Sequence, residues 1–233
     1  MSPGRAVLIP LLACALLAAG CAAPGAYGPY GYRIQTARSN PGRYTVRRGD
    51  TLYSIAWRYR LDSRALAAWN HIRAPYTIYP GRRLRLRAPV ARSDRRARRR
   101  RAPQPPRSVR APSWHWPTAG RVVETFRRGD PGRRGLDIRG RLGQPVKAAA
   151  AGRVVYSGSG LPGYGQLIII KHNDNYLSAY GYNRRLLVRE GQRVRAGQRI
   201  AEMGAVGAQG PVLHFEIRRD GRPVNPLRLL PRR

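Results

Sequence analysis

An arginine-rich stretch, RAPVARSDRRARRRRAPQPPRSVRAPS at residues 87–113, divides this chain into two parts. The stretch holds ten Arg, one Asp and several Pro, so its charges repel one another and it has few apolar side chains to bury. This composition is typical of a disordered linker. The chain of 233 residues is therefore predicted to fold as two compact segments, residues 43–86 and 114–233.

The first 20 residues predict export. An apolar run, AVLIPLLACALLAA at residues 6–19, suits the core of a signal peptide and is shorter than the ~20 residues of a membrane-spanning helix. The run ends in LAAGC, which resembles the bacterial lipobox. The resemblance implies that residues 1–20 are a lipoprotein signal peptide and that lipid on Cys21 anchors the protein to a membrane. An ordinary secretory signal with an incidental cysteine is the alternative.

The resemblance also implies a location on the periplasmic side of the outer membrane of a diderm bacterium, because in this family a residue other than Asp after the cysteine, here Ala22, favours that membrane. Residues 21–42 are rich in Gly, Pro and Tyr. This composition is typical of a flexible tether.

Two short helices are predicted in the first compact segment. Asp50 or Thr51 can cap a helix with apolar residues at helical spacing. Asp62 or Ser63 can cap a second helix, which ends at Asn70.

The runs YTV at 44–46 and RLRL at 83–86 are strand patterns that flank these helices, so the predicted order is β-α-α-β. Trp57 and Trp69 are expected in the core, because so small a unit without disulfides needs large aromatic side chains.

The whole first segment resembles the LysM domain. The opening YTVxxGDTLxxIA, the Asn after the second helix and the ending IxPGxxL carry the match. The resemblance implies binding to the N-acetylglucosamine-containing glycan strands of peptidoglycan, in a groove between two loops. The residues expected there are Gly49, Asp50, Thr51, Asn70, Tyr76, Ile78, Tyr79, Pro80 and Gly81. A LysM fold that has lost its affinity for sugars is the alternative.

Short apolar runs separated by Gly predict a mainly antiparallel β-sandwich or flattened barrel in the second compact segment. These runs cover residues 152–158, 166–170, 175–182, 199–204 and 212–217. The run LIII predicts a buried strand. Residues 143–155 and 191–204 echo each other, and both have the pattern turn, strand, turn, strand.

This second segment resembles the LytM, or lysostaphin-type, zinc peptidase domain, and within that class the lipoproteins that activate amidases. The motifs WPTxGxVxETF, GLDI, YGQLIIIKHNDNYLSAY, LVREGQxVxAGQxIAxMG and LHFEIRxxGxPVNPLRLLP carry the match over nearly all of residues 114–233. The fold class is therefore expected to be multidomain, with a small β-α-α-β LysM domain and a mainly antiparallel β-sandwich or barrel LytM domain.

The zinc ligands of this peptidase family are incomplete here. A catalytic zinc has three protein ligands and a water, which active members supply from His-x-x-x-Asp and His-x-His, with a further assisting His. Asp137 and His214 match two ligand positions, but Arg133, Val212 and Tyr182 stand where histidines would be. We expect no zinc, no other cofactor and no catalytic residue. We also expect Arg133, which stays charged, to pair with Asp137.

The resemblance implies a function for a LytM domain without its metal. Such domains bind the regulatory segment of a periplasmic N-acetylmuramoyl-L-alanine amidase and draw it off the amidase's own zinc site. The protein would then activate an amidase during septal splitting, through a groove lined by Arg133, Asp137, Tyr164, Tyr182, Val212 and His214. The alternatives are an active zinc endopeptidase with non-standard ligands and a structural tether to peptidoglycan.

The net charge of +34 points to an anionic partner. Nucleic acid is not expected in the cell, because the chain has an export signal and no stacking platform lies among the arginines. The arginine run is expected to be a solvated spacer that is attracted to anionic lipid headgroups or peptidoglycan carboxylates.

Overall fold

A computed structural model describes residues 40–89, 110–207 and 210–233. The predicted signal peptide, Cys21, and most of the predicted tether and arginine-rich linker lie outside these ranges. Among the helices within them, none is long and apolar enough to cross a membrane.

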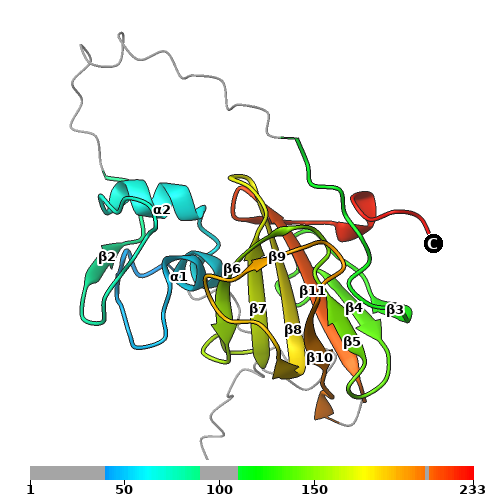
Figure 1. Cartoon of the computed structure of the whole chain (residues 1–233). Coiled ribbons are helices and arrows are strands. Elements are labelled where there is room, and N and C mark those ends of the chain that lie inside the picture. Colours follow the sequence, from blue (N-terminus) through cyan, green and yellow to red (C-terminus); the bar gives the residue numbers. More distant parts are fainter. Residues whose placement is uncertain (1–39, 90–109, 208–209) are drawn as a thin grey trace, which may run out of the picture.

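The first segment has the predicted β-α-α-β order (Figure 1). Its elements are β1 (Arg43–Thr45), α1 (Leu52–Tyr59), α2 (Ser63–Trp69) and β2 (Arg83–Arg85). Strands β1 and β2 pair antiparallel. Thr51 caps α1 in a reciprocal capping box with Ser54, and the Asp62 side chain accepts from two backbone N–H groups of α2. Asn70 ends α2, as the sequence predicts.

The second segment is built around one antiparallel sheet of ten strands. The strands are β3 (Arg121–Glu124), β4 (Leu136–Arg139), β5 (Pro145–Lys147), β6 (Gly152–Gly158), β7 (Gln166–Lys171), β8 (Tyr176–Leu186), β9 (Arg193–Val194), β10 (Arg199–Met203), β11 (Val212–Arg219) and β12 (Arg222–Val224). A short 3-10 helix, η3 (Pro226–Arg228), follows. The main order is β3-β4-β11-β8-β7-β6-β9, so the predicted antiparallel architecture with little helix is confirmed.

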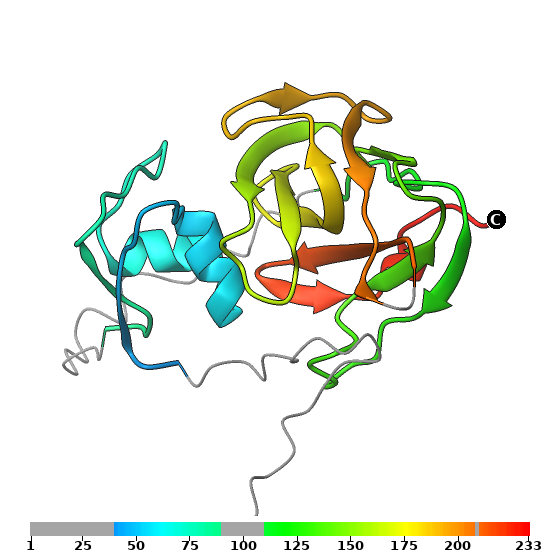
Figure 2. The same cartoon turned by 90° about the horizontal axis from the view of Figure 1, so that it is seen from below.

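Strand β8 curls the sheet because its two halves have different partners. Its first half pairs with β11 and its last residues pair with β10, which also pairs with β5 (Figure 2). The partner changes at Tyr182, which has a φ of 62°. A left-handed backbone is uncommon for a residue other than glycine. This kink lies beside the start of β11, where the candidate site is found.

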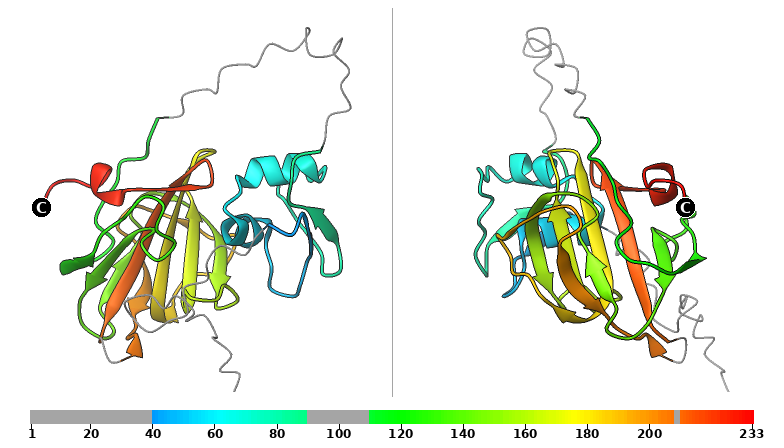
Figure 3. Two further views of the ribbon diagram at one scale, coloured as in Figure 1. Left: turned by 180° about the vertical axis from the view of Figure 1, so that it is seen from behind. Right: turned by 45° about the vertical axis from the view of Figure 1, so that its right-hand side comes forward.

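Strand β7 is buried on both of its faces. Ile168 and Ile170 face the core of the second segment. Leu167 and Ile169 face the other way and lie in a cluster with Tyr53 and Trp57 of α1. This explains why the strand is continuously apolar, since a strand with one wet face would alternate. Helix α1 therefore covers the outer face of the sheet (Figure 3).

The two tryptophans of the first segment have different places. Trp57 is only 2% exposed, but it lies in the cluster shared with the sheet and not in the core of its own segment. Trp69 is partly buried against the core of the first segment. The expectation of a buried core position is therefore confirmed for Trp57, although its ring joins the two segments and does not fill the core of the first.

Replacing Trp57 with Ala is expected to loosen the contact between the segments. Truncation of a buried Trp costs roughly 3–5 kcal/mol, so the radius of gyration of the full chain in X-ray scattering should rise as the segments separate. Trp69→Ala, the matched control within the first segment, should leave the radius unchanged. Equal radii for the wild type and Trp57→Ala would contradict the interface.

Candidate functional site

Four side chains of β11 share one face of the sheet because alternate residues of a strand point the same way. They are Val212, His214, Glu216 and Arg218. Strand β4 pairs with β11 on one side, with His214 opposite Asp137, and β8 pairs on the other, with His214 opposite Gly181. The sheet register therefore brings together Asp137 and His214, the two residues that the sequence matched to ligand positions.

His214 is held between two carboxylates. Its Nδ1 lies 2.6 Å from Asp137 Oδ1, and its Nε2 lies 3.1 Å from Glu216 Oε1. Burial alone would lower the pKa of His214, but the charges and hydrogen bonds of Asp137 and Glu216 raise it to about 10. At neutral pH the ring is therefore an imidazolium that donates from both nitrogens.

Glu216 extends this arrangement along the strand. Its side chain is fully buried, and its carboxylate accepts from the Tyr164 hydroxyl at 2.6 Å and pairs with Arg218 at 3.0 Å. Burial would raise the pKa of Glu216, but Arg218, His214 and Arg134 hold it below its usual range. Asp137, His214, Glu216 and Arg218 form a buried run of alternating charges, which we term the β11 charge network.

Arg218 connects the β11 charge network to the first segment. Its guanidinium lies 3.4 Å from the centroid of the Trp57 ring and donates to the Trp57 carbonyl oxygen at 2.8 Å. Only 1% of Arg218 is exposed. A buried guanidinium needs such partners, because an unpaired charge in the interior is costly. The tip of α1 is therefore part of the site.

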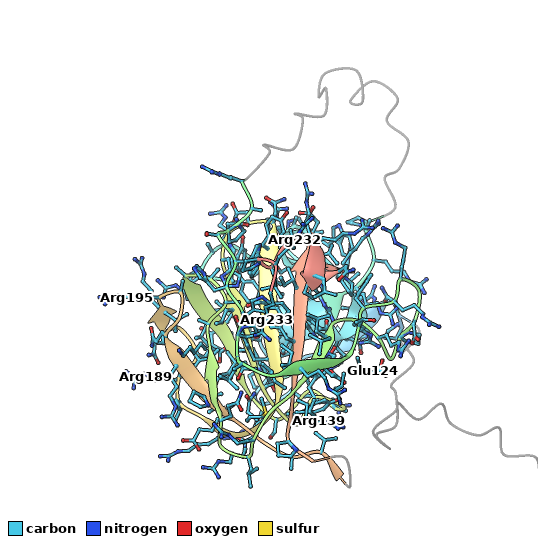
Figure 4. All side chains as sticks on the ribbon, turned by 90° about the vertical axis from the view of Figure 1, so that its right-hand side faces the viewer. Glu124, Arg139, Arg189, Arg195, Arg232 and Arg233 are labelled. Carbon is cyan, nitrogen blue, oxygen red and sulfur yellow. The ribbon has the colours of Figure 1, made fainter. Side chains whose placement is uncertain are left out.

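The expected pair between Arg133 and Asp137 is wrong. Arg133 pairs instead with Glu124 of β3, and Asp137 pairs with His214. Glu124 lies opposite Asp137 in the β3–β4 register, at a point where the register shifts. Glu124 is labelled on this edge of the sheet in Figure 4. The Arg133 guanidinium therefore pairs with Glu124 at the edge of the sheet, and His214 is the cation that pairs with Asp137.

The other predicted groove residues gather around His214. The rings of Tyr164 and Tyr182 lie 5.7 and 5.6 Å from the imidazole, centroid to centroid. Val212 is buried and lies two residues before His214 on β11. Asp137, Tyr164, Tyr182 and His214 are thus in one cluster, with Val212 next to it on β11, whereas Arg133 pairs with Glu124 of β3 instead.

The chemistry of this cluster differs from that of a zinc site. Zinc takes a lone pair from a neutral imidazole nitrogen, whereas both nitrogens of His214 are engaged with carboxylates. Within residues 40–89, 110–207 and 210–233, no group of three or more His, Cys, Asp or Glu side chains is placed to hold a metal ion.

Several predicted glycan-binding side chains are already engaged inside the first segment. Asp50 binds Arg58 and the Tyr44 hydroxyl, and the Asn70 amide bonds to Leu66 and to the Arg85 backbone. These side chains shape the loops, so sugar contacts there would come from backbone groups and aromatic faces.

Among the predicted glycan-binding residues, Thr51 and two tyrosines have distinct environments. The Thr51 hydroxyl caps α1 and donates to the Val155 carbonyl of β6 at 3.2 Å. Tyr79 is 68% exposed, while Tyr76 is partly buried with its ring 5.9 Å from that of Tyr53.

Sequence reasoning missed three residues that the structure places in the site. Glu216 and Arg218 follow His214 at the two-residue period of a strand, so the alternation could have revealed them. Trp57 could not have been found in this way, because it comes from the other segment.

Comparison with known families is consistent with this architecture. Residues 44–87 match the LysM domain, and residues 131–226 match Peptidase family M23. The fold and site therefore define a protein with a LysM domain and an M23 peptidase-type domain on one chain.

Close relatives identify the family. The chain is 43% identical over 287 residues to "Lipoprotein NlpD/LppB homolog" of Pseudomonas aeruginosa, covering 99% of this chain and 93% of that protein. It is 38% identical to "Murein hydrolase activator NlpD" of Escherichia coli, covering 82% and 68%. It is also 38% identical to "Outer membrane antigenic lipoprotein B" of Histophilus somni, covering 78% and 65%. The chain belongs to the NlpD/LppB lipoprotein family.

Similar solved structures match only part of the chain. A zinc-containing peptidase from Vibrio cholerae is 32% identical, with a TM-score of 0.44 and coverage of 48% of this chain and 39% of that one. Csd3 of Helicobacter pylori is 28% identical, with a TM-score of 0.46 and coverage of 52% and 33%.

The protonation state of His214 can be measured by NMR titration. Since two carboxylates raise its pKa to about 10, its ring should still be protonated at pH 8. His172, whose burial lowers its pKa to about 4, serves as the internal reference and should be neutral there. His214→Asn assigns the resonance. Titration of His214 near pH 6.5 would contradict the network.

The same shift predicts how stability depends on pH. The folded-state pKa of His214 lies above the ordinary value of 6.5, so protonated His214 stabilises the fold. This contribution is fully present below pH 6.5 and is lost as the pH rises toward about 10. In urea unfolding, the wild type should therefore lose more stability than His214→Asn between pH 6.5 and 10. Parallel curves for the two proteins would show that His214 is not linked to folding in this way.

Proposed function

We propose that this protein is a non-catalytic lipoprotein that binds peptidoglycan and activates a periplasmic N-acetylmuramoyl-L-alanine amidase during septal splitting. Lipid on Cys21 would hold it to the outer membrane, facing the periplasm. The LysM domain would bind glycan strands, and the face around His214 would bind the amidase.

The observation that carries the proposal is the state of His214. Both of its ring nitrogens are hydrogen-bonded to buried carboxylates, Nδ1 to Asp137 at 2.6 Å and Nε2 to Glu216 at 3.1 Å. Arg133, Val212 and Tyr182 supply no histidine nitrogen at the remaining motif positions. A surface of this chemistry suits binding rather than hydrolysis.

The names of the relatives support the same function. One is called a murein hydrolase activator, one a lipoprotein and one an outer membrane lipoprotein. These names favour an activating role, a lipid anchor and an outer-membrane location over a tether with no partner.

The charge around the site favours an acidic segment of the amidase. Arg60, at the end of α1, has its pKa lowered by burial and by the nearby charges of Arg134 and Arg218. Arg133 belongs to the M23-type domain, and its side chain is 29% exposed. Guanidinium groups that crowd together in this way gain from a carboxylate ligand, which would form charge-assisted hydrogen bonds.

Activation is a shift in the amidase between a closed and an open conformation. The activator can drive this shift only if it binds the open conformation more tightly than the closed one. Arg133, Asp137, Tyr164, Tyr182, Val212 and His214 are the residues proposed to contact the released regulatory segment.

Replacing Arg133 or Tyr182 with Ala should reduce stimulation of the organism's purified amidases by roughly 10-fold or more, as expected for the loss of a central interface contact. Arg228→Ala removes an exposed Arg outside the proposed contact set and should leave stimulation unchanged. Tyr182→Phe removes only the hydroxyl and so measures its contribution to stimulation apart from that of the ring. Full stimulation of the amidase by both alanine variants would show that the face around His214 does not bind the amidase.

Chelation distinguishes this function from that of a zinc endopeptidase. Treating the activator alone with a chelator, then removing the chelator before adding the amidase, should leave stimulation intact. The full chain alone should release no muropeptides from peptidoglycan, with or without added zinc. Zinc-dependent release by the purified chain would mean that the protein is an enzyme.

A further inference from the structure

Two cavities share lining residues on strands β6 and β7, and the first of them lies where the first segment meets the sheet. The first has a volume of about 700 Å³ and is lined on one side by Thr51, Tyr53 and Tyr76, and on the other by Arg153, Val155 and Lys171. This volume is in the range of small-molecule sites, roughly 300–1,000 Å³. The cavity thus joins both predicted glycan-binding loops to strands β6 and β7 of the other domain.

The second cavity has a volume of about 820 Å³ and shares Arg153 and Lys171 with the first. Arg193 and Arg195 add two further cations to its lining. Figure 4 shows Arg195 projecting outward at this side of the sheet. The lining residue His172 stays neutral, since burial lowers its pKa to about 4. A basic surface therefore continues directly from the glycan loops.

The geometry between the domains is set by specific contacts. The Thr51 hydroxyl donates to the Val155 carbonyl oxygen at 3.2 Å, and Arg58 donates to the Gly160 carbonyl oxygen at 3.3 Å. Tyr53 is buried in the cluster that also contains Val155. These contacts keep the glycan loops beside Arg153 and Lys171, so a ligand on the loops reaches both cations.

The charges that face the cavities leave room for an anion. Arg153 donates to the Gly191 carbonyl oxygen at 2.7 Å, which occupies only one of its donors. Lys171 pairs with Asp174 at 2.9 Å. Of the acids lining the first cavity, Asp50 is bound to Arg58, and burial raises the pKa of Glu190. The linings of the two cavities together contain four basic side chains and two acidic ones, Asp50 and Glu190. The basic side chains are Arg153, Lys171, Arg193 and Arg195.

We propose that the two cavities form one composite site for a peptide-bearing peptidoglycan strand, with the sugars on the LysM loops and the stem-peptide carboxylates on Arg153 and Lys171. This extends the glycan binding proposed above and rests on it. Neutral sugars are recognised by backbone groups and aromatic faces, whereas carboxylates form charge-assisted hydrogen bonds. One strand carries both groups, so it satisfies both halves of the site.

The test compares two ligands on the full chain by calorimetry: a chito-oligosaccharide, which is neutral, and purified glycan strands that carry stem peptides. The wild type should bind the peptide-bearing strands more tightly. Arg153→Gln/Lys171→Gln should weaken strand binding by roughly 10-fold or more, as charge-assisted bonds are lost, and should leave chito-oligosaccharide affinity within a factor of two. Arg153→Gln alone changes only an exposed side chain and should show part of the loss.

The control removes the same charge elsewhere. Arg121→Gln/Arg228→Gln removes the same number of positive charges, here from two exposed side chains, and should keep the wild-type preference for peptide-bearing strands. An equal loss of strand affinity in this control variant would show that net charge alone explains the weaker binding, and it would overturn the composite site. Unchanged strand affinity in Arg153→Gln/Lys171→Gln would overturn it as well.

Two further outcomes have separate meanings. If the wild type failed to bind the chito-oligosaccharide, glycan binding by the LysM domain would itself be wrong. If Arg153→Gln/Lys171→Gln lost binding to phosphatidylglycerol vesicles but not to strands, the cations would serve a lipid surface, and the proposal would be wrong.

Discussion

The two-sided burial of strand β7 is the constraint on which the arrangement of this molecule depends. One face of the strand completes the core of the M23-type domain, and the other is apolar and has to be covered. Helix α1 of the LysM domain covers it with Tyr53 and Trp57. The segments that the arginine-rich linker separates in sequence are therefore joined in space.

The β11 charge network, which the sheet register assembles, ends at that junction. Four ionised side chains in a dry interior would be costly alone, and they persist because each has an opposite charge beside it. Arg218 ends the network against the Trp57 ring, so the LysM domain helps to bury the last charge. The two predicted ligand positions are thus occupied by an ion pair between Asp137 and His214.

Helix α1 contacts both regions that we assign to binding. Its N-terminal end, with Thr51 and Tyr53, lines the cavity beside Arg153 and Lys171. Its C-terminal end brings Trp57 and Arg60 to the side chains around Glu216. The LysM domain is therefore more than an anchor in this structure, since its first helix shapes the surface of the M23-type domain.

The sequence alone determined the local structure and which residues stand at the motif positions. The caps Thr51 and Asp62, the β-α-α-β order and the antiparallel strands follow from local patterns, and Arg133, Val212 and Tyr182 can be read directly against the family's motifs. Only the tertiary structure decided which charges meet. In the folded structure Arg133 pairs with Glu124, and Asp137 pairs with His214. Because α1 packs against the sheet, the Trp57 ring lies against the guanidinium of Arg218. These pairings join residues that are far apart in the chain, and their partners depend on strand register and domain packing, which short-range patterns do not encode.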